Sequence, residues 1–335
     1  EKMKAIPLEK GLCENCQIIR RKVVIRVILK TKRFVSLALG LVAAAGLTQA
    51  TAAKMNVVAT TTMVTDMVKE VGGDRVSVVG MMGAGVDPHL YKPASGDVVK
   101  LQRAKVIFYS GLMLEGRMAD LFFKMARTGK KVYAVTESIP EKDRLEPPEF
   151  EGHWDPHIWG DPSLWSKCIA TVVDGLSAGD PDGKEYYTKR GASVVKSYKD
   201  VRQWALKRIA EIPKSQRVLV TSHDAFNYFG KAFGFEVVAV QGLSTVTEAG
   251  LADIAKMVDF IKGKKLKAIF VESSVNPAAI ERVSKDAGVK IGGELFSDAC
   301  GKPGEMQEGN GEKYDVGTFV GMVKHNINTI VDALK

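Results

Sequence analysis

The chain has 335 residues, of which 45% are hydrophobic and 26% are charged, so it can bury one or two cores and is not an intrinsically disordered protein. Its net charge is +9, but residues 1–53 carry ten Lys/Arg and three Glu (+7), whereas the other 282 residues carry 38 Lys/Arg and 36 Asp/Glu (+2). The excess charge therefore lies ahead of the folded part, and no basic surface for nucleic acid is predicted there.

Residues 1–29 are not expected to belong to the folded protein. The stretch that begins at Met3, MKAIPLEKGLCENCQIIRRKVVIRVILKTKRF, resembles the very small zinc-ribbon protein of the bacterial large ribosomal subunit, including its Cys13 and Cys16 pair. Leu29 stands where that family has its third cysteine, and a structural zinc site needs four ligands. We therefore interpret this segment as an upstream extension of the reading frame that is absent from the mature protein, rather than as a metal-binding knuckle.

The next segment, residues 30–53, has the layout of a secretory signal peptide. Three basic residues precede an uncharged run of 14 residues (34–47), and the small-residue sequence Ala50-Thr51-Ala52 follows as a cleavage site. A membrane anchor is the alternative, but crossing a bilayer takes roughly 20 residues. No cysteine follows the run, so a lipid anchor is not predicted. We expect a soluble periplasmic protein after cleavage of the signal peptide.

From residue 54 onward, short apolar segments alternate with longer amphipathic ones. This alternation is typical of a parallel sheet with helices on its faces. The acidic, proline-containing segment 141–152 is expected to be a surface loop. We assign residues 54–182 to an N-terminal metal-binding lobe. Its expected strands are 55–61, 75–82, 105–111 and 131–136, and its expected helices are 63–73, 95–104, 114–129 and 161–176.

Residues 183–212 form the longest expected helix. They contain no proline and keep apolar residues at helical spacing, and at about 1.5 Å per residue the helix is on the order of 40 Å long. Pro213 ends it, and the strand-helix alternation restarts in a C-terminal metal-binding lobe, residues 213–335. We predict an α/β fold of two lobes, each with a mostly parallel sheet flanked by helices, joined by one long rigid helix. The alternative is a single doubly wound sheet with a surface helix. The second lobe has expected strands at 217–222, 236–240, 267–273 and 290–295, and expected helices at 224–234, 251–264, 276–288 and 315–334.

Three of the five histidines and one aspartate lie where predicted strands end or turns open. These are His89, His157, His223 and Asp298. Ligands of open α/β sheets bind outside the carboxyl ends of the strands, so the four side chains, two from each lobe, can converge on one crevice. Three imidazoles and a carboxylate suit a borderline divalent ion such as zinc. Glu272 is an alternative to Asp298 as the fourth ligand.

Two of these histidines share an Asp-Pro-His sequence, at residues 87–89 and 155–157. Proline fixes its own φ and forces the preceding residue into an extended conformation, which makes a stiff turn that presents the imidazole. We expect the aspartate to accept a hydrogen bond from the histidine and to set its tautomer.

Longer phrases carry a resemblance to a known family. They include GAGVDPHLYKPASGDVVKL, VIFYSGLMLEG, DPHIWGDP, RVLVTSHDAFNYFGKAFGFEV, IFVESSVNP and GMVKHNINTIVDAL. Over residues 55–334 the chain is similar to the substrate-binding proteins of bacterial ABC importers for zinc and manganese, the TroA-like group. The resemblance implies two lobes bridged by a rigid helix and a buried metal held by His89, His157, His223 and Asp298. It also implies a permease in the inner membrane as partner. Zinc-uptake members often have a long histidine-rich loop before the second ligand, which is not expected here.

We therefore expect a protein that is not an enzyme and that captures a divalent transition metal ion for an ABC permease. Zinc is favoured, with manganese as the alternative, because manganese-selective relatives tend to carry Glu at the position of His223 and imidazole suits zinc. We expect a monomer that does not bind nucleic acid. The alternative function is a secreted zinc-dependent hydrolase, but Asp298 would fill the position that a catalytic zinc leaves open for water. Whether Cys168 and Cys300 form a disulfide is left open, because two cysteines offer no pattern.

Overall fold

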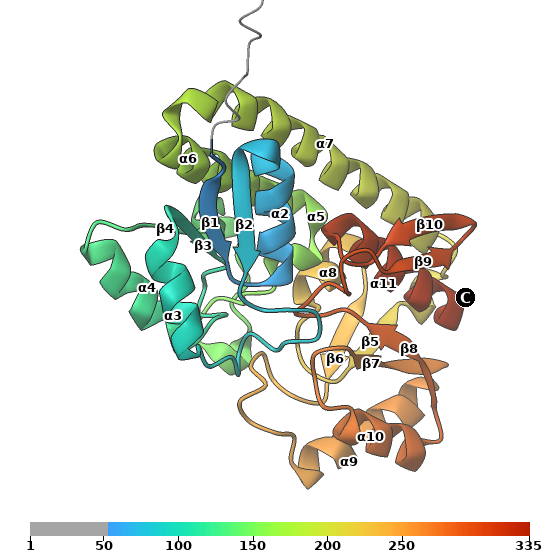
Figure 1. Ribbon diagram of the computed structural model, residues 1–335. Coiled ribbons are helices and arrows are strands. Elements are labelled where there is room, and N and C mark those ends of the chain that lie inside the picture. Colours follow the sequence, from blue (N-terminus) through green and yellow to red (C-terminus); the bar gives the residue numbers. More distant parts are fainter. Residues whose placement is uncertain (1–52) are drawn as a thin grey trace, which may run out of the picture. The chain divides into compact units, whose positions relative to one another are not determined.

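The computed structural model describes residues 53–335, so the predicted extension (1–29) and all but the last residue of the predicted signal peptide (30–53) lie outside the described residues. In the described part, an α/β fold of two lobes is joined by one long helix, as predicted (Figure 1).

The N-terminal lobe is built on four parallel strands. The strands are β1 Met55–Ala59, β2 Val76–Gly80, β3 Val106–Tyr109 and β4 Lys131–Ala134, and the helices are α2 Thr62–Gly72, α3 Ser95–Arg103, α4 Met118–Arg127, α5 Pro162–Trp165 and α6 Ile169–Gly179. Their order in the sheet is β2-β1-β3-β4. Because side chains alternate along a strand, Val57 and Phe108 join the core formed with α2 and α6, whereas Val58 and Ile107 join the core formed with α3 and α4. The sheet is therefore covered by helices on both faces.

The C-terminal lobe repeats this layering. Its strands are β5 Val218–Thr221, β6 Glu236–Ala239, β7 Ala268–Glu272, β8 Lys290–Leu295, β9 Met306–Gly309 and β10 Glu312–Asp315, and its helices are α8 Asn227–Phe233, α9 Leu251–Lys264, α10 Ala278–Ala287 and α11 Phe319–Leu334. Two parallel pairs, β5 with β6 and β7 with β8, lie next to each other through β5 and β7. Val220 and Ile269 pack with α9 and α10, and Leu219 and Phe270 face the opposite layer.

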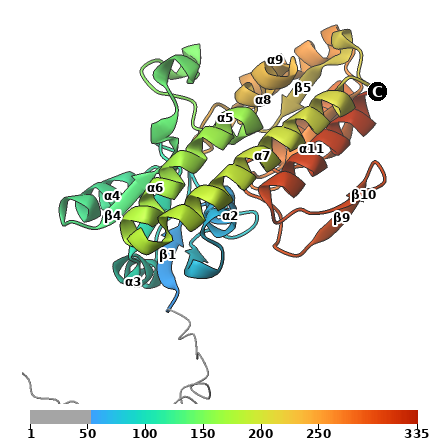
Figure 2. The same cartoon turned by 90° about the horizontal axis from the view of Figure 1, so that it is seen from above.

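Helix α7, Lys184–Ile209, joins the lobes. Its 26 residues give a length of about 39 Å. It lies against α2 and α6 of the first lobe and against α11 of the second (Figure 2). Gly191 is required there because a Cβ atom at this position would lie 2.7 Å from Cγ2 of Val173 on α6. Neither α7 nor any other helix within residues 53–335 is both long and apolar enough to cross a membrane.

The predicted helix 161–176 is divided into α5, a 3-10 turn and α6. The Asp161 side chain accepts a hydrogen bond from the Ser163 backbone N–H at 2.8 Å and so caps the N-terminus of α5. Pro162 is the first helical residue, a position where its missing N–H costs no helical hydrogen bond. Short 3-10 helices lie in this and other connections, at Gly73–Arg75, Val135–Ser138, Glu141–Asp143, Pro148–Phe150, Ile158–Gly160, Ser166–Cys168, Pro181–Gly183 and Lys214–Gln216.

The main differences from the prediction lie near the C-terminus. The final helix begins at Phe319, not at residue 315, and an antiparallel hairpin of β9 and β10 precedes it. Asn310 and Gly311 form its turn with φ angles of 52° and 75°. The Asn-Gly pair is a strong hairpin signal, because both central residues of the turn need positive φ. Similarly, α4 starts at Met118 and not at residue 114, because Leu112 and Met113 also adopt positive φ and Gly116 has φ 44°.

The two lobes are also connected at the inner end of α11. Oδ2 of Asp66 on α2 accepts a hydrogen bond from the Phe319 backbone N–H at 2.9 Å. Burial raises the pKa of Asp66 to about 7 despite this hydrogen bond. Glu70 and Asp315 also raise the pKa, and Lys69 lowers it. This carboxylate therefore carries an electrostatic cost when it ionises.

The two cysteines of the described part are separate. Cys168 and Cys300 are both buried and both free, so within residues 53–335 there is no disulfide between them. Burial raises the pKa of both thiols, which keeps them protonated and unreactive.

Candidate metal centre

Each of the four candidate ligands lies in a connection between helices and strands. His89 lies in the long connection from β2 to α3, and His157 immediately precedes the 3-10 turn Ile158–Gly160. His223 comes two residues after β5, and Asp298 comes three residues after β8. His223 and Asp298 therefore follow the carboxyl ends of parallel strands, where ligands of α/β sheets bind, whereas His89 and His157 are placed by longer connections.

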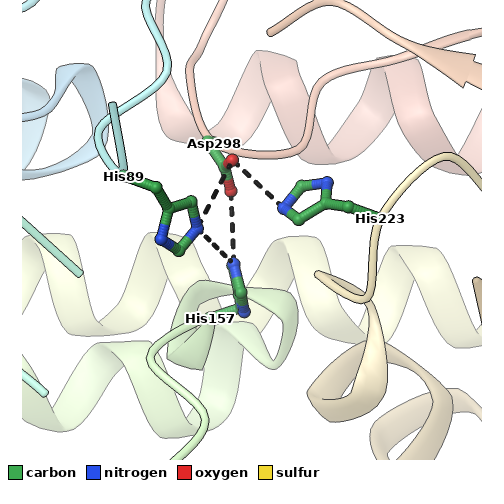
Figure 3. Close-up of side chains that lie close together, drawn as sticks. All are labelled: His89, His157, His223 and Asp298. Carbon is green, nitrogen blue, oxygen red and sulfur yellow. Dashed lines mark hydrogen bonds and ion pairs between the residues drawn. The ribbon is translucent and has the colours of Figure 1, made fainter. Parts of the chain in front are cut away.

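The structure brings all four side chains together. One donor atom from each residue lies within 4.8 Å of every other. Nε2 of His89 and Nε2 of His157 are 3.3 Å apart, and the carboxylate of Asp298 lies 3.2 Å from Nε2 of His223, 3.5 Å from that of His157 and 3.9 Å from that of His89. Figure 3 shows the four side chains arriving from different segments and pointing to a common centre.

These separations match the geometry of a bound ion. Donor atoms that lie about 2.0–2.2 Å from a tetrahedral ion are roughly 3.3–3.6 Å from one another. The four donor–donor distances given above, 3.2–3.9 Å, fall around this range. The side chains are thus spaced as the corners of a coordination shell.

Three of the donor atoms are buried without a hydrogen-bond partner in the described part of the chain. His157 and His223 are fully buried and Asp298 is 1% exposed. Among residues 53–335, neither carboxylate oxygen of Asp298 nor Nε2 of His223 has a hydrogen-bond partner. Buried polar atoms are normally paired, so atoms left open at one point fit a cation that would bind all of them.

Two of the histidines are oriented by a carboxylate on their second ring nitrogen. Nδ1–H of His157 donates to Oδ1 of Asp155 at 2.7 Å, as the Asp-Pro-His sequence predicted. Nδ1–H of His223 donates to Oε2 of Glu272 at 2.5 Å, while Oε1 of Glu272 accepts the backbone N–H of the same residue at 2.9 Å. Each carboxylate leaves Nε2 free to bind a metal. Glu272 therefore lies behind His223, and Asp298 rather than Glu272 completes the group.

The other Asp-Pro-His sequence behaves differently. Oδ1 of Asp87 accepts the backbone N–H of His89 at 2.8 Å and does not accept a hydrogen bond from its ring. The expected bond to the imidazole is therefore seen at His157 and not at His89. Of the remaining histidines, His153 is exposed, and His325 bonds to Gln307, so neither joins the centre.

The charges around the centre shift the pKa values of its members in different directions. Burial lowers the pKa of His89 to about 4, although Asp298 opposes the shift, so this imidazole is neutral near pH 7. Burial alone would lower the pKa of His223, but Glu272 and Asp298 outweigh it and raise that pKa well above its usual range. Burial alone would raise the pKa of Asp298, but the facing imidazoles, His223 first, hold it below its usual range. Metal binding would displace a proton from His223.

The aromatic wall beside the centre comes from the same segment as His157. The ring of Trp159 lies 5.3 Å from that of His157, edge to face, and its Nε1–H donates to the carbonyl oxygen of Ser297 at 2.7 Å. This bond connects the two lobes directly next to Asp298. Asn227 also supports the site, because its side-chain amide donates to Oδ2 of Asp155 at 3.1 Å. Sequence reasoning missed this contact, because nothing in the local sequence marks it.

Comparisons with known proteins agree with this description. The family described as zinc-uptake complex component A, periplasmic, matches residues 57–333. The manganese-binding lipoprotein MntA of Bacillus subtilis is 42% identical over 287 residues, which cover 84% of this chain and 90% of the relative. The zinc-binding protein TroA of Treponema pallidum is 42% identical over 283 residues, which cover 83% of this chain and 88% of the relative.

A solved structure gives the same result for the fold. The periplasmic zinc-binding protein TroA from Treponema pallidum superposes with a TM-score of 0.78 at 41% identity, and the match covers 84% of this chain and 99% of that one. The two curated relatives are equally similar to this chain, although one is named for manganese and the other for zinc. Overall similarity therefore does not distinguish the two ions.

Proposed function

This chain belongs to the family of periplasmic zinc-uptake component A proteins, and from this membership we propose that it captures a divalent transition metal ion outside the cytoplasm and delivers it to the permease of an ABC importer. The ion is bound between the lobes as cargo rather than as a cofactor.

We propose His89, His157, His223 and Asp298 as the four ligands. The observation that carries this assignment is the convergence of four donor atoms within 4.8 Å, with both oxygens of Asp298 and Nε2 of His223 left without a hydrogen-bond partner among residues 53–335. An ion at the common centre would satisfy all of these atoms at once.

Zinc is the proposed cargo, with manganese as the second candidate. Three nitrogen ligands and one carboxylate suit zinc better than manganese, which prefers oxygen ligands. The carboxylates behind His157 and His223 strengthen the case, because they make each imidazole a better donor.

Metal analysis and titration test the proposed function. The purified protein should bind one zinc ion per chain, and competition with a chelator of known affinity should rank zinc above manganese. Asp298→Asn keeps the size of the side chain but removes its charge, so it should weaken zinc binding by at least tenfold. His153→Ala changes an exposed histidine and is the matched control, expected to bind like the unchanged protein. A protein that binds no divalent metal, or an Asp298→Asn variant that keeps full affinity, would refute the assignment.

The remaining expectations rest on the family. A binding protein of an importer has no need of catalysis, so family membership favours metal capture over the hydrolase alternative. We propose that the protein acts as a monomer, with residues 54–182 and 213–335 as the two metal-binding lobes and 183–212 as the linking helix.

Export is proposed to follow cleavage of the signal peptide. The small-residue pattern places the first residue of the mature protein between Thr51 and Met55. Sequencing of the N-terminus of the exported protein checks this. A mature protein that retained Cys13 would contradict both the cleavage site and the interpretation of residues 1–29.

A further inference from the structure

His89 is anchored differently from the other two histidines of the centre. Its side chain is 5% exposed, whereas those of His157 and His223 are fully enclosed. The carboxylate of Asp87, two residues earlier, accepts the His89 backbone N–H at 2.8 Å instead of a ring N–H. The position of this imidazole therefore depends on where the backbone of residues 87–89 is fixed.

That backbone is fixed to the opposite lobe. Oδ2 of Asp87 accepts a hydrogen bond from Oγ1–H of Thr245 at 2.5 Å, between residues 158 positions apart in the chain. Thr245 lies in the connection from β6 to α9 and is 7% exposed. Leu243 in the same connection is also buried, at 3% exposed. One carboxylate thus joins the backbone of a candidate ligand to the other side of the cleft.

The chain that follows His89 is hydrogen-bonded within its own lobe. The hydroxyl of Tyr91 donates to Oδ2 of Asp97 at 2.8 Å, and Asp97 also lies in the first turn of α3. The segment therefore has one anchor in each lobe, on either side of His89. Separation of the lobes would break only the anchor at Asp87.

The bond between Asp87 and Thr245 lies at the rim of the cleft rather than at its base. Both residues line a surface groove of about 200 Å³. Their near neighbours Leu90 and Val246 are 52% and 67% exposed. At the other candidate ligands, the cross-lobe bond of Trp159 is buried. The bond between Asp87 and Thr245 is therefore only partly buried and lies closer to the protein surface than the bond of Trp159.

We propose that Asp87 and Thr245 are positioning residues that form a latch, in which closing of the lobes fixes His89 in the metal centre and opening releases it before the other three ligands. This inference rests on the proposed function of the centre. When the lobes part, the carboxylate of Asp87 loses Thr245 and gains the freedom to turn, and the His89 backbone moves with it. His157 and His223 keep their carboxylates, so the ion is left with fewer ligands and dissociates faster.

Substitutions at Thr245 test the latch. Thr245→Val removes the hydroxyl at almost constant volume, Thr245→Ser keeps it, and Thr247→Val replaces a threonine in the same way at an exposed position of the same connection. Metal release is measured by mixing the loaded protein with excess chelator. Thr245→Val should release zinc about tenfold faster, the effect of one hydrogen bond to a charged group, while the other two variants release it at the rate of the unchanged protein.

A second readout does not depend on metal. Amide hydrogen exchange of residues 83–91 in the metal-free protein should be faster in Thr245→Val than in Thr245→Ser or Thr247→Val, because the segment has lost its anchor. If Thr245→Val does not fold, Thr245→Ala tests the same bond with a smaller side chain.

The outcomes separate the latch from the proposed function. Unchanged release and unchanged exchange in the variant without the hydroxyl would refute the latch, even if the protein binds zinc. If the unchanged protein binds no metal, the proposed function fails, and the exchange measurement alone decides whether Thr245 anchors the His89 segment.

Discussion

Glu272→Gln should weaken metal binding without unfolding the protein, because it disturbs the tautomer of His223. In the structure, one oxygen of Glu272 accepts the backbone N–H of His223 and the other accepts Nδ1–H, at 2.9 Å and 2.5 Å. A glutamine has only one acceptor oxygen. If that oxygen accepts the backbone N–H, the amide N–H₂ faces Nδ1 and moves the imidazole proton to Nε2, where a metal cannot bind. If the amide is reversed, two donors face each other at the backbone.

The expected loss of affinity follows from the one hydrogen bond that is lost in either orientation of the glutamine amide. One buried donor or acceptor without a partner costs about 1–3 kcal/mol, which corresponds to a loss of roughly 5- to 150-fold in affinity. This agrees with the roughly 10- to 100-fold losses that follow removal of a carboxylate behind a metal-binding histidine. We therefore expect zinc affinity to fall by one to two orders of magnitude.

Competition titration against a chelator measures the affinity, and ¹⁵N spectra of the imidazoles report the tautomer. Glu294→Gln is the matched control, since it makes the same change at an exposed position of β8. Thermal unfolding of the metal-free variant checks that the fold is kept. An affinity within twofold of the unchanged protein, together with an unchanged His223 tautomer, would refute the reasoning.

Three further predictions concern stability, ion preference and pH. Zinc at about a thousandfold excess over its dissociation constant should stabilise the folded protein by about 4 kcal/mol in urea unfolding. His157→Ala should lose most of this stabilisation. A variant that keeps all of it would exclude His157 as a ligand. His223→Glu should narrow the zinc-to-manganese affinity ratio, because it replaces a nitrogen by an oxygen and places a third carboxylate beside Glu272 and Asp298; an unchanged ratio in competition titrations would remove the main support for zinc. Asp66→Asn should stabilise the protein above pH 7 by an amount on the order of 2–4 kcal/mol. The pKa of Asp66 is about 7 in the folded protein, so ionisation of this side chain destabilises the folded state as the pH rises from about 4 to about 7. Below pH 4 both proteins carry a neutral side chain that can accept the Phe319 N–H, so unfolding curves that differ equally at all pH values would contradict this account.

The sequence by itself determined most of the secondary structure and the members of the candidate centre. Short, nearly continuous apolar segments predicted the parallel strands, because a strand that is covered on both faces buries the side chains of both faces. The uninterrupted segment 183–212 predicted α7 for a similar reason, since the absence of proline and the helical spacing are local properties. His89, His157 and His223 could be selected because their immediate neighbours mark the ends of strands or stiff turns.

Only the tertiary structure decided how these residues are held. The Asp-Pro-His sequence is the same at both positions, yet Asp155 supports an imidazole and Asp87 bonds to Thr245 of the other lobe. Glu272 lies 49 residues from His223, and its role as a hydrogen-bond acceptor rather than a ligand depends on the adjacency of β5 and β7. Such contacts join residues that are distant in the chain, and they are selected by the packing of whole strands and lobes. Local sequence records the conformation of a segment, but the partner that a polar side chain meets across a cleft depends on the position of the other lobe.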